Sequence, residues 1–209
     1  MITFRRYYLD SFLMKANFFG DVLDVGGKKD NKRGEFRPPL SDVNSWKYLN
    51  IDADTNPDYN CSADNIPVEN NNFDVILMAE VIEHLEYPIQ VLSECYRILK
   101  EDGKFIATIP FLYPIHADPY DYQRWTPRRI EFELKNQGFK DIKVEAMGGF
   151  FAVTYDLFRF SLVNVSKNSR SIKNRIINRF LLPPLSKMCS VLDKKYMYKN
   201  KAITTGYYI

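Results

Sequence analysis

The segment DVLDVGG, residues 21–27, decides how this sequence folds. It is a short apolar run that carries an acid at Asp24 and stops on two adjacent glycines. An apolar run of this length that is closed by glycine is typical of a buried strand. Because glycine has no Cβ atom, the backbone of the turn that follows can approach a ligand closely. The segment therefore predicts a buried strand that ends in a ligand-binding turn.

Similar apolar runs recur along the chain and alternate with segments of helical periodicity. We predict strands over residues 21–27, 47–54, 73–80, 104–111, 140–147 and 202–209, and helices over residues 3–18, 87–100 and 126–138. The second helix should end at Glu101-Asp102-Gly103, and the third should begin at Thr126-Pro127 and end at Gly138, because these residues are common at helix boundaries. Strands that alternate with helices indicate the α/β class, with a mostly parallel sheet covered on both faces.

The composition is that of a single folded domain, residues 1–209. Of the 209 residues 45% are hydrophobic and 15% aromatic, which is enough to bury one core. The three cysteines lie far apart, so we expect free thiols and a reducing, cytoplasmic location. No apolar stretch approaches the roughly 18 to 20 residues that span a bilayer. The net charge of +3 hides a basic segment, residues 167–201, in which ten Lys or Arg residues accompany one acid, Asp193.

The turn after the first strand excludes two common nucleotide sites. Its sequence, GGKKDNKRG over residues 26–34, fails the Gly-x-Gly-x-x-Gly spacing that brings a helix to a pyrophosphate, and the chain has no Gly-Lys-Ser or Gly-Lys-Thr of a P-loop. The next predicted strand ends on the acids Asp52 and Asp54. One carboxylate at that place can accept hydrogen bonds from both hydroxyls of a ribose. These features predict a ligand with a nucleoside but no pyrophosphate.

Five segments carry a resemblance to a known family. They are VLDVGG (22–27), NIDAD (50–54), SADNIPVENNNFDVILMAEVIEHLEYP (62–88), LSECYRILKEDGKFIATIP (92–110) and HADPYDYQRWTP (116–127). In this order they resemble the class I, Rossmann-like S-adenosylmethionine-dependent methyltransferases, especially the small-molecule branch called type 11. The resemblance implies a three-layer sandwich whose mostly parallel sheet has about seven strands and an antiparallel last strand.

The resemblance also implies which residues bind the cofactor, S-adenosylmethionine. The expected cofactor-binding residues are Asp24, Gly26, Gly27, Asp52, Ala63, Asp64, Ala79 and Glu80. Gly26 would lie against the methionine part, with Asp24 positioning the turn or reaching the amine. Asp52 would bind the ribose, Asp64 with Ala63 would face the adenine, and Ala79 and Glu80 would line the pocket through their backbone.

The glycine turn departs from the family pattern. The family's first motif usually reads Gly-x-Gly-x-Gly, whereas Lys28 and Asp30 occupy the places of the later glycines here. Either the turn is rebuilt and still binds the cofactor, with Gly34 helping, or affinity has been lost. We favour retained binding, because the acids expected at the ribose and adenine remain.

The only two histidines, His84 and His116, both follow predicted strands and are the candidate bases, His116 before His84. The loop that begins at His116 also holds the predicted substrate-binding residues Asp118, Asp121, Tyr122 and Arg124. Carboxylates and aromatic rings suit a sugar, and an arginine suits a phosphate or carboxylate. A metal ion held by Asp118, Asp121 and His116 is conceivable, but loop carboxylates usually form hydrogen bonds, and no metal is predicted.

A basic helical insertion, about residues 150–201, should precede the last strand. Its two amphipathic pieces, broken at Pro183-Pro184 and with Ile172, Ile176 and Phe180 on one face, fit a cap over the substrate cleft, a dimer contact or peripheral contact with the inner membrane face.

The leading function is methylation of a sugar or glycan-precursor hydroxyl or amine, as in polysaccharide biosynthesis. An inactive methyltransferase-fold binding or scaffold protein and a nucleic-acid methyltransferase are the alternatives.

Overall fold

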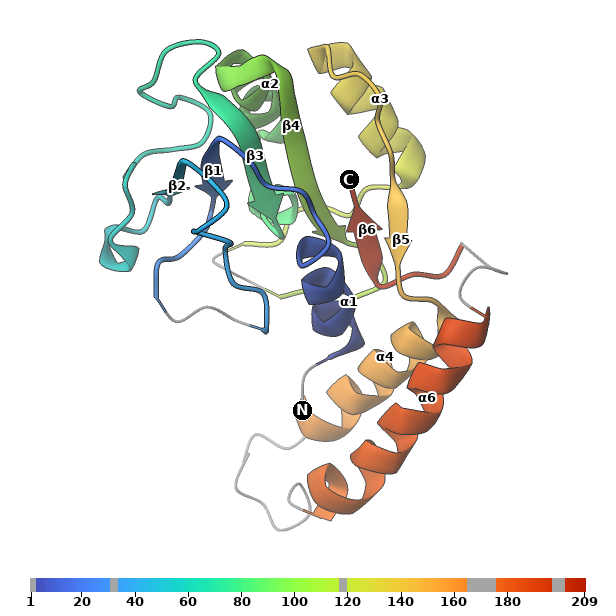
Figure 1. Cartoon of the computed structure of the whole chain (residues 1–209). Coiled ribbons are helices and arrows are strands. Elements are labelled where there is room, and N and C mark those ends of the chain that lie inside the picture. Colours follow the sequence, from blue (N-terminus) through green and yellow to red (C-terminus); the bar gives the residue numbers. More distant parts are fainter. Residues whose placement is uncertain (1–2, 31–33, 117–119, 165–175, 197–201) are drawn as a thin grey trace.

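The computed structural model describes residues 3–30, 34–116, 120–164, 176–196 and 202–209. Its centre is a sheet of six strands in the order β2-β1-β3-β4-β6-β5 (Figure 1). The strands are β1 (Asp21–Val25), β2 (Ser45–Leu49), β3 (Phe73–Ala79), β4 (Leu99–Pro110), β5 (Glu145–Met147) and β6 (Gly206–Tyr208). β2, β1, β3 and β4 are parallel, and β6 is antiparallel to both of its neighbours. The prediction of an α/β sheet with an antiparallel last strand is confirmed.

The described sheet has six strands where about seven were expected. Beyond β2 the sheet continues only as an isolated parallel bridge between Leu49 and Tyr59. The backbone N–H of Tyr48 in β2 donates to the carboxylate of Asp58 at 2.8 Å. A side chain therefore satisfies a donor that a neighbouring strand would otherwise use, and the edge of the sheet is closed without a seventh strand.

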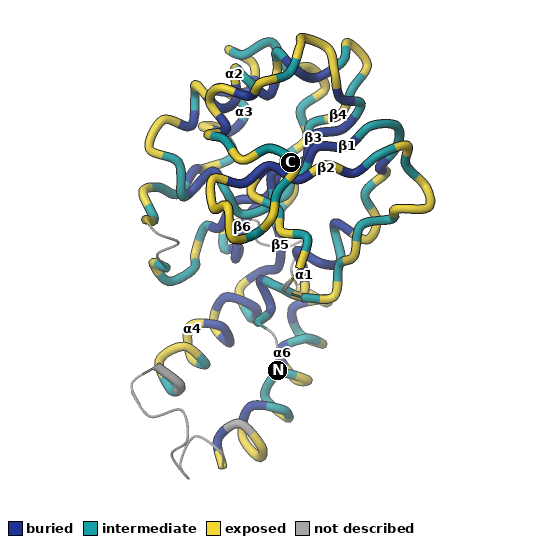
Figure 2. Tube along the Cα trace, turned by 90° about the vertical axis from the view of Figure 1, so that its left-hand side faces the viewer, coloured by how far each residue is buried: buried dark blue, intermediate teal, exposed yellow. Residues whose placement is uncertain are grey.

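Helices cover both faces of the sheet. The helical segments are α1 (Phe4–Leu13), η1 (Ala53–Thr55), η2 (Ile82–His84), α2 (Pro88–Ile98), α3 (Pro127–Gln137), α4 (Phe150–Asn164), η3 (Ile177–Leu181) and α6 (Leu182–Tyr196). One buried cluster joins α2 and α3 to the sheet, and a second joins α1, α4 and α6 to it. Figure 2 shows buried residues concentrated in the central strands and in the helix faces turned toward them. The three-layer arrangement predicted from the sequence is therefore present.

The boundaries of α2 differ from the prediction, whereas those of α3 agree with it. α3 follows the N-cap Thr126 and ends at Gly138, as expected. α2 ends at Ile98, and Glu101-Asp102-Gly103 lies inside β4. The backbone N–H groups of Asn71 and Asn72 donate to the carbonyls of Arg97 and Ile98 at 3.1 and 2.8 Å. Because a distant loop satisfies the last carbonyls of the helix, no glycine stop is needed there.

α4 and α6 lie between β5 and β6 in the sequence. They pack side by side and project from the body of the molecule (Figure 1). Two buried aspartates anchor them. Asp193 of α6 accepts hydrogen bonds from the Tyr8 hydroxyl at 2.7 Å and from the backbone N–H groups of Gly149 and Ala152 at 3.0 Å each. Asp156 of α4 accepts from the backbone N–H groups at the start of α1, at 2.8 and 2.9 Å. Each carboxylate thus satisfies orphan donors at the beginning of another helix.

The predicted break at Pro183-Pro184 is wrong, because both prolines lie in the first turn of α6, which directly follows the π-helical turn η3. Proline is tolerated in a first helical turn, where its missing N–H has no intrahelical partner. Of the three residues predicted on one apolar face, Ile176 and Phe180 are exposed, and Ile172 lies outside the described residues. Among the helices of the described ranges, none is both long and apolar enough to cross a membrane.

Candidate active site

The turn after β1 forms one wall of a cavity at the carboxyl ends of the parallel strands. Gly26 has φ of +77°, a left-handed conformation that favours glycine. A Cβ atom on Gly26 would lie 2.6 Å from a methyl carbon of Val81, and one on Gly27 would lie 2.3 Å from the carboxyl carbon of Asp24. The side-chain amide of Asn50 donates to the carbonyls of Gly26 and Gly27 at 3.2 and 3.1 Å. Bare backbone, fixed by one amide, therefore faces the cavity.

Asp52 lies beside this turn, on the segment that follows β2. That strand ends at Leu49 rather than at residue 54, because Asn50 leaves the sheet to hold the glycine turn and accepts from the N–H of Asp52 at 3.0 Å. Asp52 caps the short helix η1 through an Asp54 N–H bond of 3.1 Å and is exposed. The carboxylate is thus held at the cavity wall and is accessible to a ligand.

The end of β3 presents Glu80 to Arg5 of α1. Glu80 has φ of +60°, an uncommon conformation for a residue with a side chain. Its carboxylate accepts from the Thr108 hydroxyl at 2.9 Å and forms an ion pair with the Arg5 guanidinium. The guanidinium also lies over the Tyr113 ring, 4.3 Å from its centroid. We predicted that Glu80 lines the pocket through its backbone; its side chain also pairs with a buried cation.

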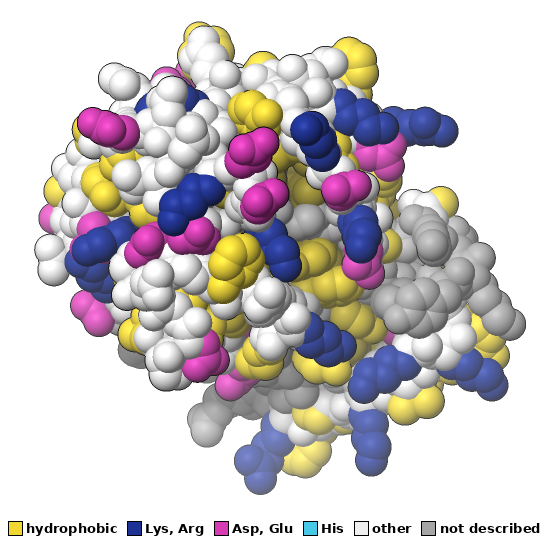
Figure 3. All heavy atoms as spheres, turned by 45° about the horizontal axis from the view of Figure 1, so that its top comes forward, with side chains coloured by type: hydrophobic (Ala, Val, Ile, Leu, Met, Phe, Trp, Pro, Cys, Tyr) yellow, Lys and Arg dark blue, Asp and Glu magenta, His cyan; other side chains and the backbone are white. Residues whose placement is uncertain are grey.

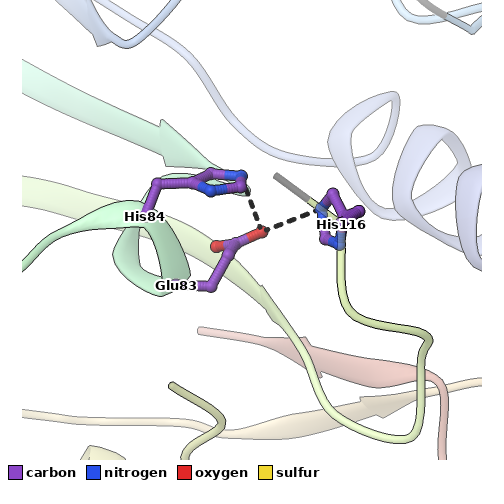
Figure 4. Close-up of side chains that lie close together, drawn as sticks. All are labelled: Glu83, His84 and His116. Atoms are coloured by element: carbon purple, nitrogen blue, oxygen red, sulfur yellow. Dashed lines mark ion pairs between the residues drawn. The ribbon is translucent and has the colours of Figure 1, made fainter. Parts of the chain in front are cut away.

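Glu83 follows a predicted strand, in a zone where we expected ligand-binding residues, but we assigned it no role; its carboxylate lies between the two histidines that line the cavity. Its side chain is fully buried at 0% exposure, and neither carboxylate oxygen has a hydrogen-bond partner. Its Oε1 lies 3.8 Å from Nε2 of His84, 3.9 Å from Nε2 of His116 and 3.5 Å from Nη2 of Arg5. Figure 4 shows both imidazoles directed toward this one carboxylate oxygen. The structure therefore brings the predicted histidines together, with their ring centroids 5.2 Å apart.

Burial controls the ionisation of this cluster. Burial raises the pKa of the Glu83 carboxyl, and the Arg5 cation opposes that change. Burial lowers the pKa of the Arg5 guanidinium to about 10, and Glu83 opposes that change. Burial and then the Arg5 cation lower the pKa of His116, so its imidazole is neutral at pH 7. A neutral imidazole is able to accept a proton or to bind a metal ion.

Asp121 and Arg124 position His116. The Arg124 guanidinium binds both carboxylate oxygens of Asp121 and holds the pKa of that carboxyl at about 2. Asp121 also accepts from the backbone N–H of His116 at 2.9 Å. These two residues, predicted to bind substrate, pair with each other and hold the shape of the loop, and neither is among the described residues that line the cavity. Tyr122 is exposed, and Asp118 lies outside the described residues.

The cavity has a volume of about 920 Å³ and contains most of the predicted site. The predicted residues that line it are Asp24, Gly26, Gly27, Asp52, Ala79, Glu80, His84 and His116. Ala63 and Asp64 are absent from its described lining: Ala63 is buried in the core and Asp64 is exposed. A larger hollow, about 1100 Å³, lies near the start of β4, remote from these groups. The cavity at the strand ends is therefore the candidate site.

We assigned no role from the sequence to Arg5, Asn50, Glu83 or Tyr113, all of which shape this site, although Glu83 and Tyr113 lie in the zones after predicted strands from which the candidates were drawn. One signal was present, because Glu83 directly precedes His84 after a predicted strand. Arg5 carries no comparable signal, because its partners are remote in the sequence.

Comparison with known proteins agrees with this geometry. Residues 43–107 match the family model described as "Methyltransferase domain". The fold is similar to a SAM-dependent methyltransferase from Archaeoglobus fulgidus, with a TM-score of 0.59, 18% identity and coverage of 97% of this chain and 90% of that one. It is also similar to Haemonchus contortus phosphoethanolamine N-methyltransferase 2, with a TM-score of 0.53, 18% identity and coverage of 98% of this chain and 50% of that one. A third similar fold is that of the [4+2]-cyclase SpnF, with a TM-score of 0.55, 15% identity and coverage of 97% of this chain and 78% of that one. No curated protein matches the chain.

Family match and fold agree with the resemblance seen in the sequence: residues 43–107 match a methyltransferase domain, and the fold is that of the class I, Rossmann-like methyltransferases. The Haemonchus contortus enzyme was solved in complex with S-adenosyl-L-methionine, the cofactor that the sequence resemblance implies for this chain. The cavity suits that cofactor, because the backbone of Gly26 and Gly27 and the Asp52 carboxylate line it together.

Proposed function

We propose that this protein transfers the methyl group of S-adenosylmethionine to a hydroxyl or amine of a small, sugar-type molecule. One observation carries the proposal: a single cavity joins the glycine turn and Asp52 to His84 and His116, whose rings flank the buried Glu83 carboxylate. The first set suits a nucleoside with a bulky sulfonium tail. The second suits a polar acceptor that must lose a proton.

The cofactor would be held by residues on the β1 and β2 side. The backbone of Gly26 and Gly27 would lie against its methionine part, and the Asp52 carboxylate would accept from the ribose hydroxyls. The cofactor supplies a methyl group that is already activated by positive sulfur. The protein mainly has to align the acceptor with that methyl group, and alignment of this kind contributes about 7–11 kcal/mol in favourable cases.

His116 is our candidate for receiving the acceptor's proton, with His84 as the second choice. Both imidazoles lie at the cavity, and the neutral form of His116 is available at pH 7. The exposed rings of Tyr120 and Tyr122 lie next to each other, with centroids 5.8 Å apart, and the His84 ring hydrogen-bonds to the Tyr120 carbonyl. Two adjacent aromatic faces next to polar groups suit a sugar ring, which supports a glycan precursor as acceptor.

The test is cofactor binding followed by methyl transfer. Purified protein is titrated with S-adenosylmethionine by calorimetry and then incubated with labelled cofactor and a panel of nucleotide sugars, with products read by mass spectrometry. Asp52→Ala should weaken cofactor binding at least tenfold, while Asp102→Ala, at an exposed site on β4, should not. Binding without transfer to any member of the panel would favour an inactive binding protein. Transfer to RNA or DNA alone would favour the nucleic-acid alternative, and unchanged affinity in Asp52→Ala would contradict the cofactor site.

We also propose that the projection formed by α4 and α6 makes peripheral contact with an anionic membrane. Its exposed residues include Phe158, Phe180, Leu181 and Val191, beside Lys187, Lys194 and Lys195. Figure 3 shows Lys and Arg side chains among hydrophobic ones on this lower part of the molecule. Apolar residues that insert and cations that attract lipid headgroups are typical of interfacial helices. The protein should therefore cosediment with phosphatidylserine vesicles and lose most of that binding in Phe180→Glu; equal binding to neutral vesicles would contradict an electrostatic contribution.

A further inference from the structure

Three potential metal ligands meet beside the cavity that His84 and His116 line. One oxygen of Glu83 and one ring nitrogen each of His84 and His116 all lie within 4.8 Å of one another (Figure 4). Two ligands bound to one ion at about 2.1 Å lie roughly 3.0 to 4.2 Å apart, depending on their angle at the metal. The observed separations of 3.8 and 3.9 Å between the carboxylate oxygen and the two Nε2 atoms fall in this range.

The backbone fixes both imidazoles in the form that binds metal. Nδ1 of His84 hydrogen-bonds to the Tyr120 carbonyl, and Nδ1 of His116 to the Pro114 carbonyl at 3.3 Å. A carbonyl oxygen accepts only, so each Nδ1 carries the proton and donates it. In this tautomer the lone pair of each ring is on Nε2, the atom that faces Glu83. This arrangement, with an outer carbonyl that orients the ring, is the one found around protein metal ions.

The carboxylate itself lacks adequate partners. Glu83 is fully buried, and neither of its oxygens accepts a hydrogen bond. Among the described residues, the permanently charged cation that forms an ion pair with Glu83 is Arg5, which lies 3.5 Å away and also pairs with Glu80. A buried carboxylate without hydrogen bonds is costly unless a cation compensates it. A divalent ion between Glu83 and the two Nε2 atoms would supply that cation.

We infer that Glu83, His84 and His116 form a binding site for a divalent first-row transition-metal ion. Two imidazoles and one carboxylate suit Mn²⁺, Fe²⁺, Co²⁺ or Zn²⁺ better than Mg²⁺ or Ca²⁺, which prefer oxygen ligands alone. Three protein ligands leave positions open for water or a substrate oxygen. We did not predict this site from the sequence. Helix α2 and strand β4 separate His116 from Glu83 and His84 along the chain, so no local spacing groups the three residues.

What the ion does rests on the proposed methyl transfer, whereas its binding does not. An acceptor hydroxyl at an open position would have a lowered pKa, because the ion stabilises the alkoxide. Its proton would pass to solvent water, since Nε2 of His116 is then a ligand and no longer a base. The C–O bond forms as the S–CH₃ bond breaks, and the sulfonium leaves as a neutral thioether.

Binding is tested on the full chain without donor or acceptor. Protein dialysed against EDTA is titrated with Co²⁺, followed by visible absorption, and with Zn²⁺, followed by calorimetry. We expect one ion per chain, with visible bands that report imidazole ligation. Glu83→Gln, His84→Asn and His116→Asn should each weaken binding by about 10-fold to 100-fold or more. The matched control is Glu86→Gln, an exposed carboxylate on the same segment, which should bind as the unmodified protein does.

Glu83→Gln also separates loss of a ligand from loss of fold. The amide has the size of the acid but no charge, so the metal-free variant should melt at the same temperature as the parent or higher. Equal Co²⁺ affinity in the parent and in all three ligand variants would overturn the site. So would a loss of Co²⁺ affinity in the control Glu86→Gln as large as the loss in the ligand variants, or no Co²⁺ binding by the parent. If the ion binds but EDTA leaves methyl transfer unchanged, the site stands and its role in acceptor activation is wrong. If it binds and no methyl transfer is found, the proposed function fails and the site stands.

Discussion

Replacing Arg5 by methionine tests whether the buried charges of the site compensate one another. The variant keeps most of the side-chain volume but leaves Glu80 and Glu83 without the cation that lies against both. Removal of one member of a buried ionic cluster costs about 3–5 kcal/mol, because an uncompensated charge remains. In a chain of this size 1 kcal/mol corresponds to about 2–4 °C in melting temperature. We therefore expect Arg5→Met to melt roughly 6–20 °C below the parent at pH 8.

The sign of the pH dependence follows from the pKa of Glu83. Burial already raises this pKa in the folded protein, and loss of Arg5 removes the main group that opposes the rise. A carboxyl whose folded pKa exceeds its unfolded pKa lowers the free energy of unfolding as pH rises between the two values. The penalty in Arg5→Met should therefore shrink toward acid, by up to about 1.4 kcal/mol per pH unit for each proton taken up.

Urea denaturation at pH 5, 6, 7 and 8 measures this, with Arg128→Met on the exposed side of α3 as the control. The control should change the free energy of unfolding by less than about 0.5 kcal/mol at every pH. The double variant Arg5→Met, Glu83→Gln should recover part of the loss, since one unpaired charge is gone. A penalty that is independent of pH and unchanged in the double variant would refute the charge argument and leave lost packing as its cause.

Three further predictions concern the turn, the loop and the projection. Gly26→Ala should lower the free energy of unfolding by about 1–2 kcal/mol for its positive φ alone, and should weaken cofactor binding by calorimetry because the new Cβ atom meets Val81; unchanged affinity would mean that the turn does not face the cofactor. The Arg124 pair depresses the pKa of Asp121 to about 2, so its contribution to stability should be present above about pH 4 and lost as pH falls toward 2; thermal melts of Asp121→Asn should differ from the parent at pH 6 and converge with it at pH 2. Asp193→Ala removes three buried hydrogen bonds to a carboxylate and should cost about 3 kcal/mol or more, with faster limited proteolysis of the projection; resistance equal to the parent would show that apolar packing alone holds it.

The parts of the fold that were predictable depend on local signals. The buried run of β3 and both ends of α3 follow from side chains within a few residues: Thr126 accepts from the N–H of Arg129, and Gly138 takes the left-handed conformation. The end of α2 was predicted incorrectly, because backbone donors about thirty residues away along the chain satisfy its carbonyls. Boundaries set by distant partners leave no mark in the local sequence.

The candidate site divides in the same way. The rule that parallel sheets bind ligands at their carboxyl ends correctly selected Gly26, Asp52, His84 and His116, which all line one cavity. The same rule gave no means of distinguishing a residue that faces the cavity from one that supports it. Asp121, in the selected zone, holds the loop of His116 instead of lining the cavity.

Arg5 shows why the rest was beyond prediction. The opening sequence, MITFRRYYLD, offers two adjacent arginines, and nothing local distinguishes the buried one from its neighbour. Tertiary contacts orient α1: its residues Phe4, Tyr8, Leu9 and Leu13 pack into the core, and the carboxylate of Asp156 in α4 accepts from the backbone N–H groups of Phe4 and Arg5. The Arg5 guanidinium is then directed at Glu80 and Glu83. A buried carboxylate in the projecting helices thus helps to hold the helix that carries this cation to the active site, and the helical projection is a structural part of that site.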